Sequence, residues 1–165
     1  YIIRDLFLFS CYTGISYGDM CLLTKDDLVT DENGTLWIRT SRKKTKVEYE
    51  VPLLEVPLHI LSKYRDVEPN GKLLPMYCNS DVNKYLKTIA TKCGINRRIV
   101  FHAARHTYAT EITLSHGVPL ETVSKMLGHT RVDTTQIYAK VTDDKINADT
   151  KRLDNKISER FTIAI

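Results

Sequence analysis

Apolar residues dominate the first dozen positions of the chain. Residues 2–12 carry only two charges, Arg4 and Asp5, among aliphatic and aromatic side chains, a pattern typical of a buried helix. Gly14 follows, and a glycine just after a helical run is a common stop signal. Ser16 is a favourable N-cap residue, so we expect a second, short helix in the YGDMCLL segment behind it.

The pattern then changes to alternating polar and apolar residues. TLWIRT (residues 35–40) and VEYEVPL (residues 47–53) alternate as strands do, and a turn signal, Asp-Glu-Asn-Gly, precedes the first of them. The basic segment SRKKTK, residues 41–46, is expected to connect the two strands as a hairpin. A short strand at residues 27–30 is expected alongside, so these residues predict a small antiparallel sheet.

The remaining segments follow a helical period and are separated by glycine and proline signals. Ser80 is expected to cap one helix that ends before Gly94, Gly117 to stop another, and Pro119 and Gly128 to bracket a third. Helices are expected at residues 54–65, 80–93, 102–116, 119–127, 131–139 and about 143–160. The predicted fold class is mainly α with a small antiparallel β-sheet (α+β), in a single domain over residues 1–165.

Composition places the chain among ordinary globular domains. Its 165 residues, 42% hydrophobic and 27% charged, suffice for one buried core. The net charge of +4 is compatible with an anionic partner but does not select one. The four cysteines form no CxxC pair, so we expect reduced thiols and neither a zinc knuckle nor a disulfide framework. No apolar run approaches the roughly 18 residues that span a bilayer, and no signal peptide is recognisable, so we expect a soluble, cytoplasmic protein.

Two histidines and an arginine cluster at the start of HAARHTYATEIT, residues 102–113. His102 and His106 share a helix face, but Ala103 stands where the zinc motif HExxH needs glutamate, and we expect no metal site. His102 and Arg105 also share a face. This pair suits phosphate chemistry, since a guanidinium holds two nonbridging oxygens and an imidazole donates or shuttles a proton. For such a pair on its own, a solvated helix face remains the alternative.

Further motifs lie before and after this cluster in the sequence. HAAR at residues 102–105 is followed by LGH at 127–129 and by Tyr138, while TGISYGDMCLL at 13–23 and KKTKVEYEVPL at 43–53 precede it. In order, spacing and wording these five motifs resemble those of the tyrosine recombinase, or phage integrase, family. The resemblance spans nearly the whole chain and implies the C-terminal catalytic domain of such an enzyme.

The resemblance implies a site-specific DNA recombinase that breaks and rejoins DNA strands. Tyr138 would attack a scissile phosphodiester to give a covalent 3′-phosphotyrosine and a free 5′-hydroxyl. Arg105 would be the main clamp on the nonbridging oxygens, His129 a second donor and His102 the general acid/base. A phenol with its ordinary pKa of about 10 is ionised in only about one molecule in a thousand at pH 7, so neighbouring cations and a base must activate it.

The hairpin connection supplies further cations. The resemblance implies that Lys44 protonates the leaving 5′-oxygen, with Lys43 as the alternative. Arg42, Lys43 and Lys46 are expected to contact DNA phosphates nonspecifically or to face water. Because the phosphotyrosine bond conserves the energy of the phosphodiester, the resemblance implies neither ATP, nor a metal, nor another cofactor.

The chain departs from the family pattern at Ser16, where the TGLR motif places a second clamping arginine. Some integrases of mobile elements carry this serine, and the chain resembles that subgroup. Arg4 is our candidate substitute, because an arginine in an apolar segment needs a partner or a role; pairing with Asp5 or exposure to solvent is the alternative. Asp19, where the family has an acidic residue, is expected to orient His102 or an arginine.

Partners follow from the same resemblance. The chain opens on Tyr1, inside a helical pattern, so we expect a fragment whose N-terminal core-binding domain is absent. The implied partner is double-stranded DNA, on which residues 143–165 would form a tail helix that docks onto a neighbouring subunit of a tetramer; the fragment alone is expected to be a monomer. Three other interpretations stay open: a helix-turn-helix DNA-binding protein built on residues 118–140, a type IB topoisomerase, and an inactive integrase relic.

Overall fold

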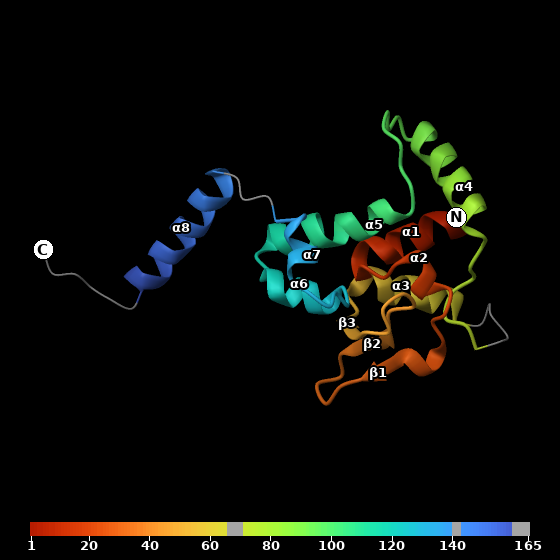
Figure 1. The fold of residues 1–165 in the computed structure, drawn as a ribbon, viewed down its shortest axis with the longest axis horizontal. Coiled ribbons are helices and arrows are strands. Elements are labelled where there is room, and N and C mark those ends of the chain that lie inside the picture. Colours follow the sequence, from red (N-terminus) through yellow and green to blue (C-terminus); the bar gives the residue numbers. More distant parts are fainter. Residues whose placement is uncertain (66–70, 140–142, 160–165) are drawn as a thin grey trace, which may run out of the picture.

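The computed structural model describes residues 1–65, 71–139 and 143–159, and most of them form helices around a small sheet (Figure 1). Helix α1 (Ile2–Thr13) contacts α3, α4 and α5, and its side chains Leu6 and Phe9 are fully buried. It ends at Gly14, whose φ of 70° lets its N–H bond to the Ser10 carbonyl. The predicted buried helix and its glycine stop are confirmed.

Two short helical elements follow α1. Ser16 caps α2 (Tyr17–Met20): its hydroxyl donates to the Asp19 carboxylate at 2.8 Å and lies 3.4 Å from the Asp19 N–H. A turn of 3₁₀-helix, η1 (Lys25–Asp27), leads into the sheet. The predicted cap is confirmed, but α2 is shorter than the YGDMCLL segment, because the chain turns at Cys21.

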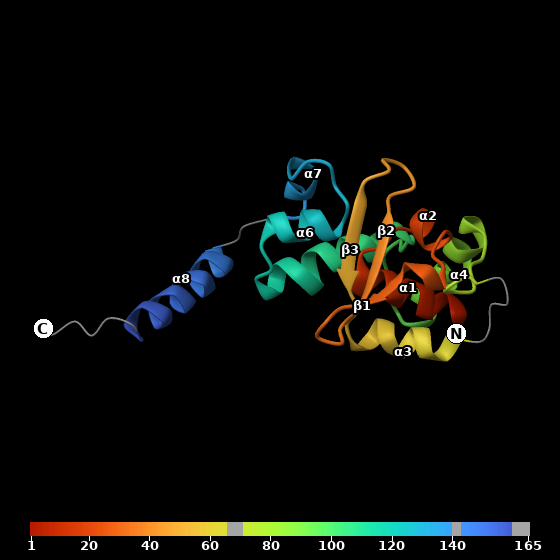
Figure 2. The same cartoon turned by 90° about the horizontal axis from the view of Figure 1, so that it is seen from below.

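The sheet of the described residues is antiparallel, in the order β1-β2-β3. Its strands are β1 (Leu28–Thr30), β2 (Leu36–Ser41) and β3 (Glu48–Pro52), with Ile38 opposite Val51 and Thr40 opposite Tyr49. Ile38, Tyr49 and Val51 are buried in the core. In Figure 2 the tip of the β2–β3 hairpin rises on the same side of the molecule as α2 and α7. The predicted hairpin, with its basic connection, is confirmed.

Helices form the rest of the described chain. They are α3 (Glu55–Tyr64), α4 (Asn79–Lys92), α5 (His102–Thr107), η2 (Tyr108–Thr113), η3 (Leu114–His116), α6 (Leu120–Met126), α7 (Asp133–Gln136) and α8 (Asp143–Ser158). The mainly helical fold with a small antiparallel sheet is thereby confirmed. Helix α8 projects away from the other elements in both views (Figures 1 and 2); residues 160–165 of the predicted tail lie outside the described residues.

Three helices differ from the prediction in detail. The single helix expected at residues 102–116 passes from α-helix to a π-helical turn, η2, and then to a 3₁₀ turn. The Thr113 hydroxyl bonds to the carbonyls of Tyr108 and Ala109 at 3.0 and 2.8 Å, which stabilises the wider turn. Helix α4 begins at Asn79, one residue before the expected start, and Cys78 rather than Ser80 is its cap residue. Helix α7 has four residues instead of the nine expected at 131–139.

None of the helices among the described residues is both long and apolar enough to cross a membrane.

Candidate active site

Arg105 lies at the centre of the candidate site and is only 2% exposed. Its Nη1 donates to the Gly14 carbonyl at 2.7 Å, and its Nη2 donates to the Leu127 carbonyl and contacts His129. These contacts take three of the five N–H groups of a guanidinium. Burial, followed by repulsion from Arg42, lowers the pKa of Arg105 to about 10, so the group stays charged at neutral pH. The guanidinium is therefore fixed in orientation before any ligand binds.

His129 is held between two partners just after α6. Its Nε2 lies 3.0 Å from Arg105 Nη2, and its Nδ1 lies 2.7 Å from the hydroxyl of Thr135. Burial and then the charges of Arg105 and Arg42 lower the pKa of His129 to about 4. The imidazole is therefore neutral at pH 7 in the DNA-free protein.

Gly128 makes this arrangement possible. Its φ is 63°, and a Cβ at this position would lie 2.8 Å from Cγ of Arg42 and 2.9 Å from the ring of Tyr49. The glycine thus lets the LGH segment turn sharply while an arginine side chain passes directly over its backbone.

Arg42 enters the site from the tip of the β2–β3 hairpin. It is 16% exposed; its Nε lies 3.3 Å from the Asp19 carboxylate and its Nη1 3.4 Å from the Leu127 carbonyl. The same carbonyl accepts from Arg105, so two guanidinium groups share one peptide oxygen. The sequence interpretation, which placed Arg42 on an exposed turn, is wrong on its burial, since the hairpin folds this residue inward.

Asp19 ties Arg42 to the segment that lacks the expected arginine. One carboxylate oxygen accepts from the backbone N–H of Lys43 at 2.9 Å, and the other accepts from the hydroxyl of Ser16 at 2.8 Å and faces Arg42. The sequence held a signal for this pairing: an acidic residue in an apolar segment whose usual cationic neighbour is replaced by serine requires a cation from elsewhere.

Tyr138 and the two histidines of the HAARH segment stack in series. The rings of His102 and His106 meet edge to face at 4.9 Å, and those of His106 and Tyr138 at 5.0 Å. Tyr138 is 9% exposed, while His102 is exposed, with a pKa lowered by its packing and then by His106, Arg105 and Arg42. His106, considered in the sequence analysis only as a metal ligand, thus lies between the predicted nucleophile and the predicted general acid/base.

A cavity of about 350 Å³ lies on one side of this cluster, next to His102 and Arg105. His102 and Arg105 line it together with Ser16, and α4 supplies Asn79 and Asn83 to its wall. The cavity therefore lies directly beside the position at which the chain carries serine instead of arginine.

Arg4 is not part of this cluster. Its guanidinium donates to Asp5 at 2.8 and 2.7 Å, and its side chain is 50% exposed. Lys63 and Tyr64 of α3 also donate to Asp5, and these hydrogen bonds outweigh the effect of burial and hold the pKa of Asp5 at about 2. Arg105 contacts Gly14, which follows Arg4 by ten residues, or roughly 15 Å along the helix. The structure therefore corrects the prediction that Arg4 replaces the missing arginine: Arg4 pairs with Asp5 instead.

The lysines of the hairpin connection lie outside the packed cluster. Lys43, Lys44 and Lys46 are exposed at its tip, and the backbone of Lys46 has a φ of 59°. Among the described residues, His, Cys, Asp and Glu side chains form no group of three that could bind a metal ion.

Comparison with known proteins identifies the family of this fold. The model of the phage integrase family matches residues 2–145. A tyrosine recombinase XerD of Listeria monocytogenes is 34% identical in an alignment 145 residues long, and the match covers 79% of this chain and 47% of the relative. A tyrosine recombinase of Thermosipho africanus is 30% identical over 141 residues, 81% of this chain and 48% of that protein, so the chain spans about half the length of the curated relatives it matches.

Solved structures of recombinases have a similar fold. The site-specific recombinase XerH, crystallised with a palindromic difH substrate after cleavage, superposes with a TM-score of 0.71 at 21% identity, over 92% of this chain and 45% of that one. This chain therefore belongs to the phage integrase family of tyrosine recombinases.

Proposed function

We propose that this chain is the catalytic part of a site-specific DNA recombinase that cuts DNA through Tyr138. The observation that carries the proposal is that Arg105 and Arg42 share the Leu127 carbonyl and Arg105 contacts His129, while Tyr138 packs edge to face on His106 of the same helix as Arg105. Two fixed guanidinium groups and an imidazole are suited to an anion with several oxygens, and a buried phenol beside them is suited to attack on phosphorus.

The reaction would be an in-line displacement at a DNA phosphodiester. The oxygen of Tyr138 forms a bond to phosphorus, and the bond from phosphorus to the 5′-oxygen breaks. His102 takes the phenolic proton, directly or through His106, and Lys44 gives a proton to the leaving 5′-oxygen. The reverse reaction with the 5′-end of a partner strand completes the exchange, without metal or ATP.

Arg42 would fill the role of the second clamping arginine. Ser16 leaves space beside the cavity, and Asp19, three residues later, holds Arg42 through an ion pair of 3.3 Å. The repulsion between Arg42 and Arg105 that lowers the pKa of Arg105 would be relieved by a phosphate bound between them. The serine thus does not by itself imply an inactive relic.

His129 would change its protonation state on binding. In the free protein its Nε2 faces a guanidinium, whereas a donor to a nonbridging oxygen needs a proton on this atom. A phosphate that neutralises the two arginines would raise the pKa of His129 and so convert it into that donor.

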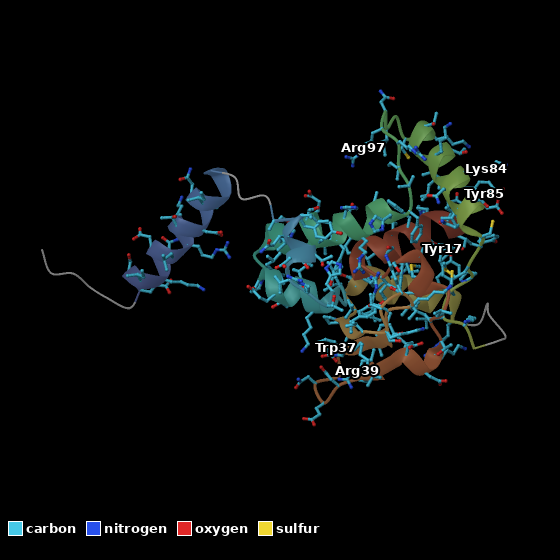
Figure 3. All side chains as sticks on the ribbon, viewed as in Figure 1. Tyr17, Trp37, Arg39, Lys84, Tyr85 and Arg97 are labelled. Atoms are coloured by element: carbon cyan, nitrogen blue, oxygen red, sulfur yellow. The ribbon has the colours of Figure 1, made fainter. Side chains whose placement is uncertain are left out.

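A basic cavity next to the site supports DNA as the substrate. The cavity has a volume of about 790 Å³, lies between α4 and the loop after it, and shares Asn83 and Val100 with the catalytic cavity. Its wall carries four cations: Lys84, Lys87, Arg97 and Arg98. Figure 3 shows Lys84 and Arg97 on this outer part of the molecule. Such a surface suits a duplex whose backbone runs on from the scissile phosphate.

The tail helix supports assembly with further subunits on DNA. Ile146, Leu153 and Ile157 of α8 are exposed and spaced by seven and four residues, so they lie on one face of the helix. We propose that this face docks onto a neighbouring subunit of a DNA-bound tetramer. A helix-turn-helix regulator is the weaker proposal, because α7, with four residues, is too short for a recognition helix.

A nicked suicide substrate tests the proposal. The substrate is a pool of duplexes with a randomised centre, 5′-labelled on the strand upstream of a nick, so that the short fragment with the new 5′-hydroxyl diffuses away and the label stays on the protein. We expect a covalent adduct on a denaturing gel with the natural chain and with Tyr77→Phe, an exposed control, and none with Tyr138→Phe.

Each other interpretation predicts a different result. A pure DNA-binding protein or a relic gives no adduct with any variant, and this result on the full-length protein with its own site would end the proposal. A topoisomerase forms the adduct and also relaxes supercoiled plasmids that carry no recombination site.

A further inference from the structure

Thr135 lies between the nucleophile segment and the phosphate-binding cluster. It is completely buried in α7, and its hydroxyl lies 2.7 Å from Nδ1 of His129. Its carbonyl accepts the backbone N–H of Tyr138 at 3.0 Å. One residue therefore contacts both the imidazole predicted to bind phosphate and the main chain of the predicted nucleophile.

The hydrogen bonds of His129 determine where its proton lies. A guanidinium has only N–H groups and no acceptor, so Arg105 Nη2 donates and His129 Nε2 accepts across their 3.0 Å contact. A neutral imidazole with an acceptor at Nε2 carries its proton on Nδ1. The Nδ1–H group then donates to the hydroxyl oxygen of Thr135.

We propose that Thr135 is a positioning residue that holds the ring of His129 with Nε2 directed at Arg105, which in turn keeps the proton on Nδ1. The inference rests on the proposed function, because it gives the tautomer a purpose: Nε2 already points to the place that a phosphate oxygen would take. When His129 gains its second proton, Nδ1–H continues to donate to Thr135, so the ring acquires a donor at Nε2 without turning.

The same contact couples two steps of site assembly. Thr135 lies in α7, and its carbonyl also accepts from the backbone N–H of Tyr138 in the turn that follows. Docking of the nucleophile segment therefore fixes the orientation of the phosphate-binding imidazole at the same time.

Nitrogen-15 NMR of the histidine side chains tests the inference on the 165-residue chain without DNA. Long-range proton–nitrogen spectra distinguish a protonated from an unprotonated ring nitrogen, and His129→Gln identifies the signals of His129. We expect Nδ1 to be protonated and Nε2 unprotonated in the natural chain and in Thr135→Ser. Thr135→Val keeps the shape but removes the partner of Nδ1, so the ring is free to turn away from Arg105 and we expect the two nitrogens to average or to exchange roles.

Thr134→Val is the matched control, because Thr134 is the exposed neighbour of Thr135 in the same helix. It should leave the His129 signals unchanged. A natural chain with the proton on Nε2, or Thr135→Val with the spectrum of the natural chain, would overturn the inference. If Thr135→Val does not fold, the spectra of the natural chain and of Thr135→Ser still decide.

The covalent adduct assay gives the functional consequence. We expect Thr135→Val to form adduct about tenfold more slowly, as for the loss of one orienting hydrogen bond in the transition state, and Thr135→Ser to restore the rate to within about twofold. An equal loss in both variants would show that the hydroxyl has no role. The NMR result stands whether or not the chain cleaves DNA, so failure of the inference and failure of the proposed function are distinguishable.

Discussion

At position 16 the chain carries a serine, and the cation beside it comes from the hairpin 26 residues later. Asp19 is the link, because it accepts from Ser16 and pairs with Arg42. We propose that Arg42 supplies the positive charge that the family places at position 16, so that the origin of this charge in the chain changes. This arrangement makes Arg42 the most informative single residue of the site.

Substitution of Arg42 should lower cleavage strongly. We expect Arg42→Ala to form adduct about a hundredfold more slowly than the natural chain, by analogy with the removal of one oxyanion donor, and Arg42→Lys to lie between them. The adduct assay with the nicked pool measures this. Arg39→Ala, which removes an exposed arginine of β2, is the control and should cleave at the full rate.

A second substitution separates a role in phosphate binding from a role in folding. Ser16→Arg in the Arg42→Ala background restores a guanidinium beside the cavity, with Asp19 again available as its partner. A partial recovery of the cleavage rate is expected. If Arg42→Ala cleaves at the full rate, the proposed role of Arg42 is wrong.

His129 should make stability depend on pH. Its pKa falls from 6.5 to about 4 on folding, so the unfolded chain binds more protons between these values, and stability falls as the pH drops from 7 to 5. Because His129 is only half-buried, solvent screens part of this effect, and we expect a contribution on the order of 1 kcal/mol over this interval. Urea unfolding at both pH values should show a smaller difference for His129→Gln, whereas exposed His59→Gln should match the natural chain; equal differences in all three would contradict the assignment.

At the scale of elements, the sequence predicted those whose signals are local. The apolar run with Gly14 after it gave α1, and alternation on either side of a basic loop gave the β2–β3 hairpin. The π-helical turn η2 was not predicted, because six residues are too few to distinguish its period from that of an α-helix. Its stabilising contact, Thr113 with two carbonyls, shows only in three dimensions.

The candidate site shows the same difference between features with a local sequence signal and contacts that only the structure shows. The HAAR and LGH segments and Tyr138 could be placed by order and spacing, and the structure brings Arg105 and His129 into contact. Order and spacing could not identify a substitute for the arginine that is missing at Ser16. Arg4 stood out in the sequence because its segment is apolar, yet it pairs with its neighbour Asp5, whereas Arg42 looked like one of several loop cations. Ion pairs between distant segments leave no periodic signal.

At the scale of the whole molecule, the small net charge conceals an uneven distribution. The cavity between α4 and the following loop carries Lys84, Lys87, Arg97 and Arg98, and it adjoins the catalytic cavity through Asn83. Such a surface is expected to supply the affinity for DNA, while the catalytic cluster contributes to only one phosphate.

Removal of two of these charges should change the salt dependence of binding. We expect Lys84→Gln with Lys87→Gln to reduce the slope of log affinity against log salt by about 2, since each phosphate contact contributes about 0.9. Fluorescence anisotropy with a labelled duplex of random sequence, over a series of KCl concentrations, measures the slope. The control variant, Lys25→Gln with Lys156→Gln, removes two exposed lysines from other elements and should leave the slope unchanged. An equal decrease of the slope in both double variants would show that the basic cavity does not contribute more to DNA binding than other lysines do.

The peptide between Leu127 and Gly128 has a consequence for how this site assembles. Its single oxygen accepts from both Arg105 and Arg42, and the next residue, His129, depends on the same turn. A rotation of this one peptide plane would break the contacts of both cations with the Leu127 carbonyl, while Arg105 keeps the Gly14 carbonyl, Arg42 keeps Asp19 and His129 keeps Thr135. The positions of the two cations are therefore coupled through one oxygen atom, so a change in the LGH turn would alter the contacts of Arg105 and Arg42 together.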